Sequence, residues 1–188
     1  MKIAITGTIG SGKSTASEYL RNKGYHVFDC DAYNRYLLEE GNPSYEFIKE
    51  NFSECFTDSL LDKKKVASVI FSDNEKKKKL EDFVHPLIVE KMLEEMEEYS
   101  LFFAEVPLLF ECDLDIYFDL CVLVCVNEET ALKRLENRGF NKEEASARIN
   151  KQMTLELKKK RADEIVYNDL DLANLYRQIE ELLDKYVR

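Results

Sequence analysis

A glycine-rich segment near the N-terminus carries the strongest chemical signal in this 188-residue chain. Residues 7–14 read GTIGSGKS, which matches the pattern GxxxxGK(S/T), and Thr15 extends it. Glycines let successive backbone N–H groups point into one anion-binding hollow, and the lysine of this pattern reaches the β- and γ-phosphates of a nucleotide. The serine hydroxyl of the pattern ligates Mg²⁺. The residues expected to bind a nucleoside triphosphate are Gly10, Ser11, Gly12, Lys13, Ser14 and Thr15.

Acidic side chains follow two apolar runs of the sequence. Asp29 and Asp31 come after residues 25–28, at the end of a predicted strand, where open α/β sheets bind their ligands. Asp31 lies further into the expected loop, so we assign it as the general base, whereas Asp29 is interpreted as a helix cap. Glu105 ends another apolar run and suits a water-mediated contact to Mg²⁺, with a solvated strand-end acid as the alternative. Glu111 is a weaker candidate of the same kind.

Basic residues gather in one late segment of an acidic chain. The whole chain has a net charge of −10, but residues 133–161 hold ten bases and four acids, a local charge of +6. A helical, basic segment of this kind suits a lid that closes over phosphates. Arg138, beside Gly139, is the candidate phosphate clamp. The three lysines at 158–160 are expected on a solvated helix face.

Short apolar or β-branched runs alternate with helical patterns along the chain. A helix is expected at residues 13–23, ending at Gly24. The alternation predicts an α/β fold around a central parallel five-stranded sheet. The strands are expected at residues 2–6, 25–28, 101–106, 120–126 and 164–167.

Residues 33–99 are expected to form a helical insert that contains no strand. Apolar residues between positions 80 and 92 recur at the spacing of a buried helix face. Pro86 interrupts this pattern, so a break or kink is expected at His85–Pro86. The expected organisation is a nucleotide-binding core at 1–32 and 100–188, a lid at about 133–161 and the insert at 33–99.

Composition excludes several functional classes. The negative charge argues against general nucleic-acid binding, and no apolar run approaches the roughly 20 residues of a membrane-spanning helix. Five cysteines without a CxxC pair fit a reducing cytoplasm. Because the base-reading motif of GTPases is missing, small-molecule kinases remain the favoured class. A binding module that hydrolyses ATP slowly to switch a partner is the alternative from another class.

Segments along nearly the whole chain resemble the dephospho-CoA kinase family of P-loop small-molecule kinases. The phosphate loop alone is generic, whereas HPLI at 85–88 and PLLFE at 107–111, in this order, are specific. The other matching segments are ITGTIGSGKST at 5–15, DCDA at 29–32 with Arg35, LDK at 61–63, RINKQ at 148–152, AD at 162–163 and Asn168. The chain departs from the family pattern at Thr8, Lys63, Glu105 and Gly139.

The resemblance implies a three-layer P-loop kinase fold with a helical acceptor-binding insert and a helical lid. It implies transfer of the ATP γ-phosphoryl group to the ribose 3′-hydroxyl of dephospho-CoA, the last step of coenzyme A synthesis. Asp31, Lys13 and Arg138 would then be catalytic, and Ser14 and Glu105 would hold Mg²⁺. The acceptor would be bound by Asp31, Arg35, His85, Pro107 and Leu108. A cytoplasmic monomer or weak homo-oligomer is expected, and a nucleoside or nucleoside-monophosphate kinase is the alternative enzyme.

Overall fold

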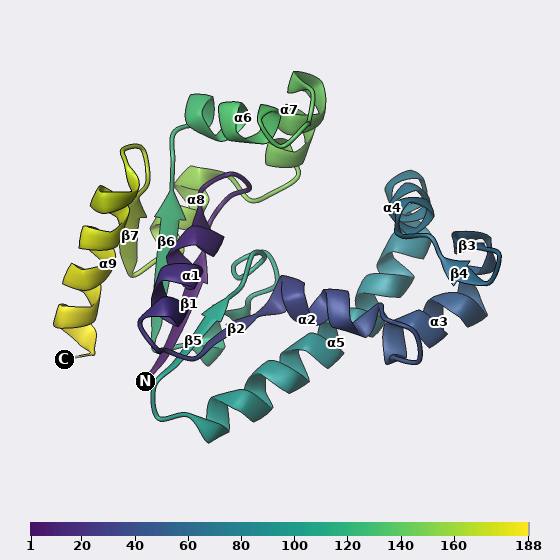
Figure 1. Cartoon of the computed structure of the whole chain (residues 1–188), viewed down its shortest axis with the longest axis horizontal. Coiled ribbons are helices and arrows are strands. Elements are labelled where there is room, and N and C mark those ends of the chain that lie inside the picture. Colours follow the sequence, from purple (N-terminus) through teal and green to yellow (C-terminus); the bar gives the residue numbers. More distant parts are fainter. Residues whose placement is uncertain (188) are drawn as a thin grey trace. The chain divides into compact units, whose positions relative to one another are not determined.

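The chain folds into two compact units in the computed structural model, which describes residues 1–187 (Figure 1). The first unit contains Met1–Asp29 and the residues from Met96 onward, and the second contains Cys30–Glu95. Each unit has a hydrophobic core of its own. The roles expected for the core, the lid and the insert stay predictions.

A five-stranded sheet, parallel throughout, forms the centre of the first unit (Figure 1). Its strand order is β2-β5-β1-β6-β7, which confirms the predicted α/β fold with a central parallel sheet. The second strand begins two residues later than expected and includes Asp29. The strands are β1 (Lys2–Thr6), β2 (Val27–Asp29), β5 (Phe102–Glu105), β6 (Leu120–Cys125) and β7 (Glu164–Tyr167).

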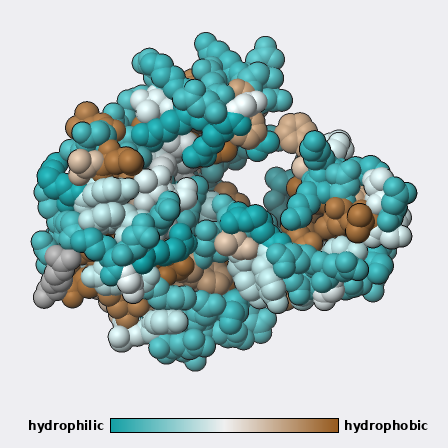
Figure 2. Space-filling view, in the orientation of Figure 1, coloured by the Kyte–Doolittle hydropathy of each residue, from teal (hydrophilic) through white to brown (hydrophobic). Residues whose placement is uncertain are grey.

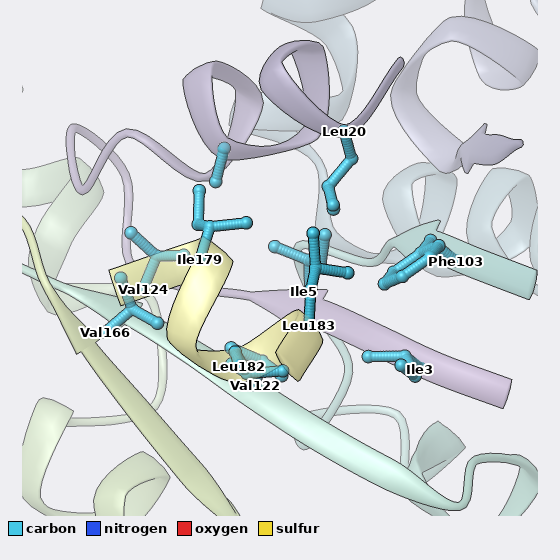
Figure 3. A pocket seen from close by; sticks show the side chains of 11 residues that line it. Ile3, Ile5, Leu20, Phe103, Val122, Val124, Val166, Ile179, Leu182 and Leu183 are labelled. Carbon is cyan, nitrogen blue, oxygen red and sulfur yellow. The ribbon is translucent and has the colours of Figure 1, made fainter. Parts of the chain in front are cut away.

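Two helices pack against this sheet to make the main core: α1 (Lys13–Asn22) and α9 (Leu172–Tyr186). Every fourth residue of α9 from Leu175 to Leu183 is buried, as expected where one helix face lies on a sheet. A small apolar cavity lies in this core, lined by side chains of both helices and of the sheet (Figure 3). No polar side chain lines it, so it belongs to the packing of the core.

The basic segment at 133–161 contains the end of one helix and two complete helices, with the turns between them (Figure 1). These are α6 (Glu128–Glu136), α7 (Lys142–Asn150) and α8 (Leu155–Arg161). Each begins at a side-chain cap, provided by Asn127, Asn141 and Thr154 in turn. A 3₁₀ turn, η2 (Leu114–Tyr117), precedes β6.

The second unit is mainly helical, but it contains a short hairpin that corrects the expectation of no strand. Strands β3 (Phe56–Thr57) and β4 (Leu60–Leu61) pair antiparallel. Asp58 and Ser59 between them both adopt positive φ, the geometry of a tight hairpin turn. Strands of two residues leave no alternating pattern in a sequence, so this hairpin cannot be predicted from periodicity. The remaining elements are α2 (Cys30–Leu37), α3 (Pro43–Asn51), η1 (Ser53–Cys55), α4 (Lys63–Ser72) and α5 (Asn74–Glu98).

Helix α5 continues through Pro86, so the predicted break at His85–Pro86 is wrong, whereas a kink there stays a prediction. Proline removes one hydrogen bond to the preceding turn, which disfavours a helix interior. Leu80 and Val84 before the proline and Met92 after it are buried, and this packing holds the helix on both sides.

The face of the molecule in Figure 2 is largely hydrophilic, and hydrophobic residues show on it only in small groups. Individual large apolar side chains are exposed, such as Ile116 and Phe71. Isolated residues of this kind are common on folded proteins. None of the helices in residues 1–187 is both long and apolar enough to cross a lipid bilayer.

Candidate functional site

The glycine-rich loop connects β1 to α1 and has a backbone that only glycine tolerates at key positions. Gly12, the N-cap of α1, has φ of 91°. A Cβ on Gly12 would overlap Nδ2 of Asn168, and a Cβ on Gly7 would overlap the carbonyl oxygen of Val124. The loop therefore lies tightly against residues at the ends of β6 and β7, and a side chain at either glycine would displace it.

Two side chains from outside the loop hold its carbonyl groups. The Arg134 guanidinium donates to the carbonyl oxygens of Gly10 and Ser11 at 3.2 and 3.3 Å, and to that of Asn168 at 2.9 Å. The Asn168 amide donates to the Ser11 carbonyl at 2.7 Å. These hydrogen bonds fix the carbonyl side of the loop against residues from outside it.

Arg134 is a functional residue absent from the sequence prediction, and the helical period of α6 carries a signal for it. Ala131 and Leu135 of the same helix are buried, so the helical period places position 134 on the inward side of α6. Gln152, the last residue of the family-like segment RINKQ, is a second such residue. Its side-chain oxygen accepts a hydrogen bond from the backbone N–H of Ile9 at 2.8 Å.

The N-terminal end of α1 is suited to binding an anion. Its first turn contains no acidic residue, so the positive end of the helix dipole is not neutralised there. Lys13 is half-buried, and Ser14 is exposed with its hydroxyl at the first turn. The residues expected to bind a triphosphate are thus together at one loop and one helix end.

Glu105 is the last residue of β5 and is only 4% exposed, which excludes the alternative of a solvated strand-end acid. Its register partners on the adjacent strands are Ile5 and Asp29. Within the described residues 1–187, its Oε2 atom has no hydrogen-bond partner. Burial raises the pKa of the Glu105 carboxyl, the nearby Ser17 hydroxyl and the Lys13 charge oppose this rise, and the Asp29 charge adds to it.

An unpartnered, buried carboxylate oxygen at a strand end is a suitable contact for a hydrated cation. No group of three or more His, Cys, Asp or Glu residues arranged to hold a metal occurs in the part of the chain that is described. Mg²⁺ in nucleotide sites needs only one or two protein oxygens, because phosphates and waters complete its coordination. Glu105 and the Ser14 hydroxyl therefore fit Mg²⁺ brought in with a nucleotide.

The candidate acceptor residues lie on both units. Asp31 is in the first turn of α2 and not in a loop as expected, because α2 begins directly after β2. Arg35 follows Asp31 by one helical turn, so both exposed side chains share a face of α2. Asp29, at the end of β2, lies 3.6 Å from the Arg21 guanidinium. His85 is half-buried on α5.

Pro107 and Leu108, by contrast, lie in the first unit, in the turn after β5. Leu108 is 37% exposed, so part of its side chain is available for contact. Arg138 is exposed in the turn after α6, and Gly139 beside it provides the expected bend with φ of 92°.

Lys158 corrects the expectation that all three lysines at 158–160 are solvated. Its side chain is fully buried and forms an ion pair of 2.8 Å with Glu111, whereas Lys160 is exposed. Lys158 begins the basic run KKKR at 158–161, so nothing in the adjacent sequence marks it as buried. Glu111, the weaker of the two candidate metal-site acids, is the partner of this lysine.

Comparison with known proteins gives a family match over most of the chain. The family model described as Dephospho-CoA kinase matches residues 1–174. A dephospho-CoA kinase of Bacillus cereus is 38% identical, with 98% of this chain and 96% of that protein aligned. One of Listeria monocytogenes is 35% identical over 99% and 97% of the two chains.

Solved structures with the same fold agree with this match. A Thermus thermophilus protein superposes with a TM-score of 0.88 at 36% identity, covering 100% of this chain and 98% of that one. Dephospho-CoA kinase from Campylobacter jejuni has a TM-score of 0.72 at 30% identity, with coverage of 98% and 97%. Shikimate kinase from Bacteroides thetaiotaomicron, at 17% identity and a TM-score of 0.58, shares the fold alone.

Proposed function

This chain belongs to the dephospho-CoA kinase family, and we propose that it phosphorylates the ribose 3′-hydroxyl of dephospho-CoA with ATP. The supporting observation is the extent of the family match, which includes residues 1–174 and so contains all of Cys30–Glu95 as well as the phosphate loop. The acceptor segments are therefore matched along with the generic nucleotide-binding segment.

The proposed reaction is a direct in-line transfer. The oxygen of the 3′-hydroxyl attacks the γ-phosphorus, the bond from that phosphorus to the β–γ bridging oxygen breaks, and ADP leaves. Asp31 accepts the proton of the hydroxyl. Lys13 and Arg138 offset the charge that develops on the transferring group. Ser14 and Glu105 would hold Mg²⁺, which would supply charge neutralisation at the phosphates.

Acceptor binding is assigned to Asp31, Arg35, His85, Pro107 and Leu108, on the strength of the resemblance. Residues 33–99 form the proposed acceptor-binding part, and residues 133–161 form the proposed lid. The bases of the lid support this role, because closure over phosphates needs positive charge and exclusion of water.

The location and assembly of the protein are further proposals. A cytoplasmic location is supported by the odd number of cysteines without a CxxC pair. The substrates proposed as partners are ATP and dephospho-CoA, with the protein acting as a monomer or weak homo-oligomer. The net charge of −10 supports the proposal that nucleic acid is not a partner.

The test is a coupled ADP-release assay with dephospho-CoA, adenosine, AMP and CMP offered separately as acceptors. We expect turnover with dephospho-CoA and only background ADP release with the other three. Mass spectrometry of the product should show one added phosphoryl group, and dephospho-CoA lacking the 3′-hydroxyl should give none. Activity confined to adenosine, AMP or CMP would instead establish a nucleoside or nucleotide kinase.

A further inference from the structure

A chain of polar contacts connects the phosphate loop to the turn after β5, and the proposed mechanism does not use it. Gln152 and Met153 lie in the short connector between α7 and α8. The Gln152 side chain accepts a hydrogen bond from the Ile9 N–H of the phosphate loop, while the Met153 N–H donates to Glu111 Oε1 at 3.0 Å. The two neighbouring connector residues therefore contact different parts of the site, the phosphate loop and the residue that ends the PLLFE segment.

The Glu111 carboxylate is held in turn by Lys158. The lysine Nζ lies 2.8 Å from Oε1 and 2.9 Å from Oε2 of Glu111. It also donates to the carbonyl oxygen of Pro107 at 3.4 Å. One ammonium group thus binds both the first and the last residue of the turn at 107–111. The Lys158 side chain is 0% exposed and that of Glu111 is 18% exposed.

A pair buried to this degree is a weak source of stability. Removing two charged groups from water offsets most of their attraction, and apolar pairs of similar volume often replace buried ion pairs without loss of stability. What an apolar pair would not reproduce is the set of directed bonds to Met153 and Pro107. The geometry therefore gives this pair a role in orientation.

We propose that Gln152, Glu111 and Lys158 are positioning residues that hold the phosphate loop and the turn at 107–111 in one fixed arrangement. The Glu111–Lys158 pair fixes the position of the connector. Gln152 on that connector then fixes the position of the Ile9 N–H and, with it, the first half of the phosphate loop. This inference deepens the proposed function. Its prediction for the KM of dephospho-CoA rests on that function, whereas its prediction for the Kd of ATP needs only ATP binding.

The test combines an apolar replacement of the pair with a substitution of Gln152. The double variant Glu111→Leu/Lys158→Met removes both charges, and Gln152→Ala removes the acceptor for the Ile9 amide. We expect both to keep the wild-type melting temperature within about 3 °C. Calorimetric titration should show the Kd for ATP raised about fivefold in each, the size expected for loss of an ordering hydrogen bond.

Two further readouts separate positioning from packing. The triple variant combines the pair replacement with Gln152→Ala. Because both changes act through one connector, its Kd for ATP should be no higher than the higher Kd of its two parents. If the two changes acted independently, their effects on the Kd would multiply. The pair variant should also raise the KM for dephospho-CoA through the turn at 107–111, whereas Gln152→Ala should leave that KM unchanged. Arg177→Met/Glu181→Leu, which replaces an exposed ion pair on α9 outside the proposed lid, is the control and should leave every value unchanged.

Wild-type ATP affinity in a folded pair variant or in Gln152→Ala would overturn the inference, as would multiplicative effects in the triple variant. If the pair variant does not fold, Gln152→Ala, whose contact to Ile9 is only partly buried, still decides whether that contact tunes ATP binding. If the wild type binds ATP but does not phosphorylate dephospho-CoA, the proposed function fails while the ATP titrations still test this network.

Discussion

Glycine at position 12 is needed for two independent reasons. Its φ of 91° is unfavourable for any residue with a Cβ, and that Cβ would overlap the Asn168 side chain. Gly12→Ala should therefore raise the Kd for ATP by at least about tenfold, since the loop must shift away from Asn168. Calorimetric titration checks this.

Gly24 provides the matched control, because it has the same φ of 91° but no atom lies within 4 Å of the position that a Cβ would take. Gly24→Ala should lower the free energy of unfolding by about 1 kcal/mol and leave ATP affinity unchanged. Equal ATP affinity in the two variants would show that the close approach to Asn168 does not matter.

Asp31 is expected to act on the acceptor and not on the nucleotide. Asp31→Asn keeps the shape of the side chain but removes its ability to accept a proton, so kcat should fall by about 10²- to 10⁴-fold. The Kd for ATP should stay within about twofold of the wild-type value, because Asp31 is not expected to contact the nucleotide. Lys13→Ala, in contrast, should lower both ATP affinity and turnover. Full turnover in Asp31→Asn would remove this residue from the mechanism.

Strand β6 illustrates how burial in an element controls the chemistry of its side chains. All six of its residues are buried, because neighbouring strands flank it and helices cover it. Burial raises the pKa of the Cys121 thiol to about 12 and that of Cys125 to about 11. A raised thiol pKa leaves little of the reactive thiolate at neutral pH.

The native protein should therefore show almost no alkylation of Cys121 or Cys125 by iodoacetamide between about pH 7 and 9. Cys112, which is only partly buried, should react first. Peptide mass spectrometry after brief labelling distinguishes the five cysteines, and labelling in urea is the control for intrinsic reactivity. Rapid labelling of either β6 cysteine in the folded protein would contradict the burial of this strand.

Helix α5 shows the converse, a sequence signal that packing overrides. Pro86 lowers the local preference for helix, yet buried residues on both sides hold α5 continuous over Asn74–Glu98. The unfavourable preference of a proline is worth about 3 kcal/mol, which the burial of several apolar side chains offsets. The proline can be read from the sequence, whereas the packing of the residues around it cannot.

Each of the two compact units has a hydrophobic core of its own, and this separation is testable. Ile48 is fully buried in the core of the second unit, and Leu175 is fully buried in that of the first. Ile48→Ala and Leu175→Ala should each lower the free energy of unfolding by about 2–5 kcal/mol. Urea unfolding followed by circular dichroism measures this.

The two variants should differ in nucleotide binding while they remain folded. The phosphate loop belongs to the unit that contains Leu175, so Leu175→Ala should weaken ATP binding and Ile48→Ala should leave it unchanged. Equal weakening in both would mean that the two cores are not independent with respect to the nucleotide site.

Much of the nucleotide-binding half could be predicted from local sequence. The loop at residues 7–14 follows from glycine spacing, and the five strands follow from apolar runs that are each continuous in the chain. Backbone freedom and side-chain periodicity act over a few residues, so both can be read without knowledge of distant contacts.

Tertiary structure alone decided which charged groups are buried and what they hold. Lys158 looks like one of three solvated lysines until the fold brings it to Glu111, 47 positions earlier in the chain. Arg134 and Gln152 reach the phosphate loop from 123 and 143 positions away. The burial of Glu105 likewise depends on strands β1 and β2 on either side of it. Desolvation and hydrogen-bond partnership are properties of the packed environment, and residue type by itself does not specify them.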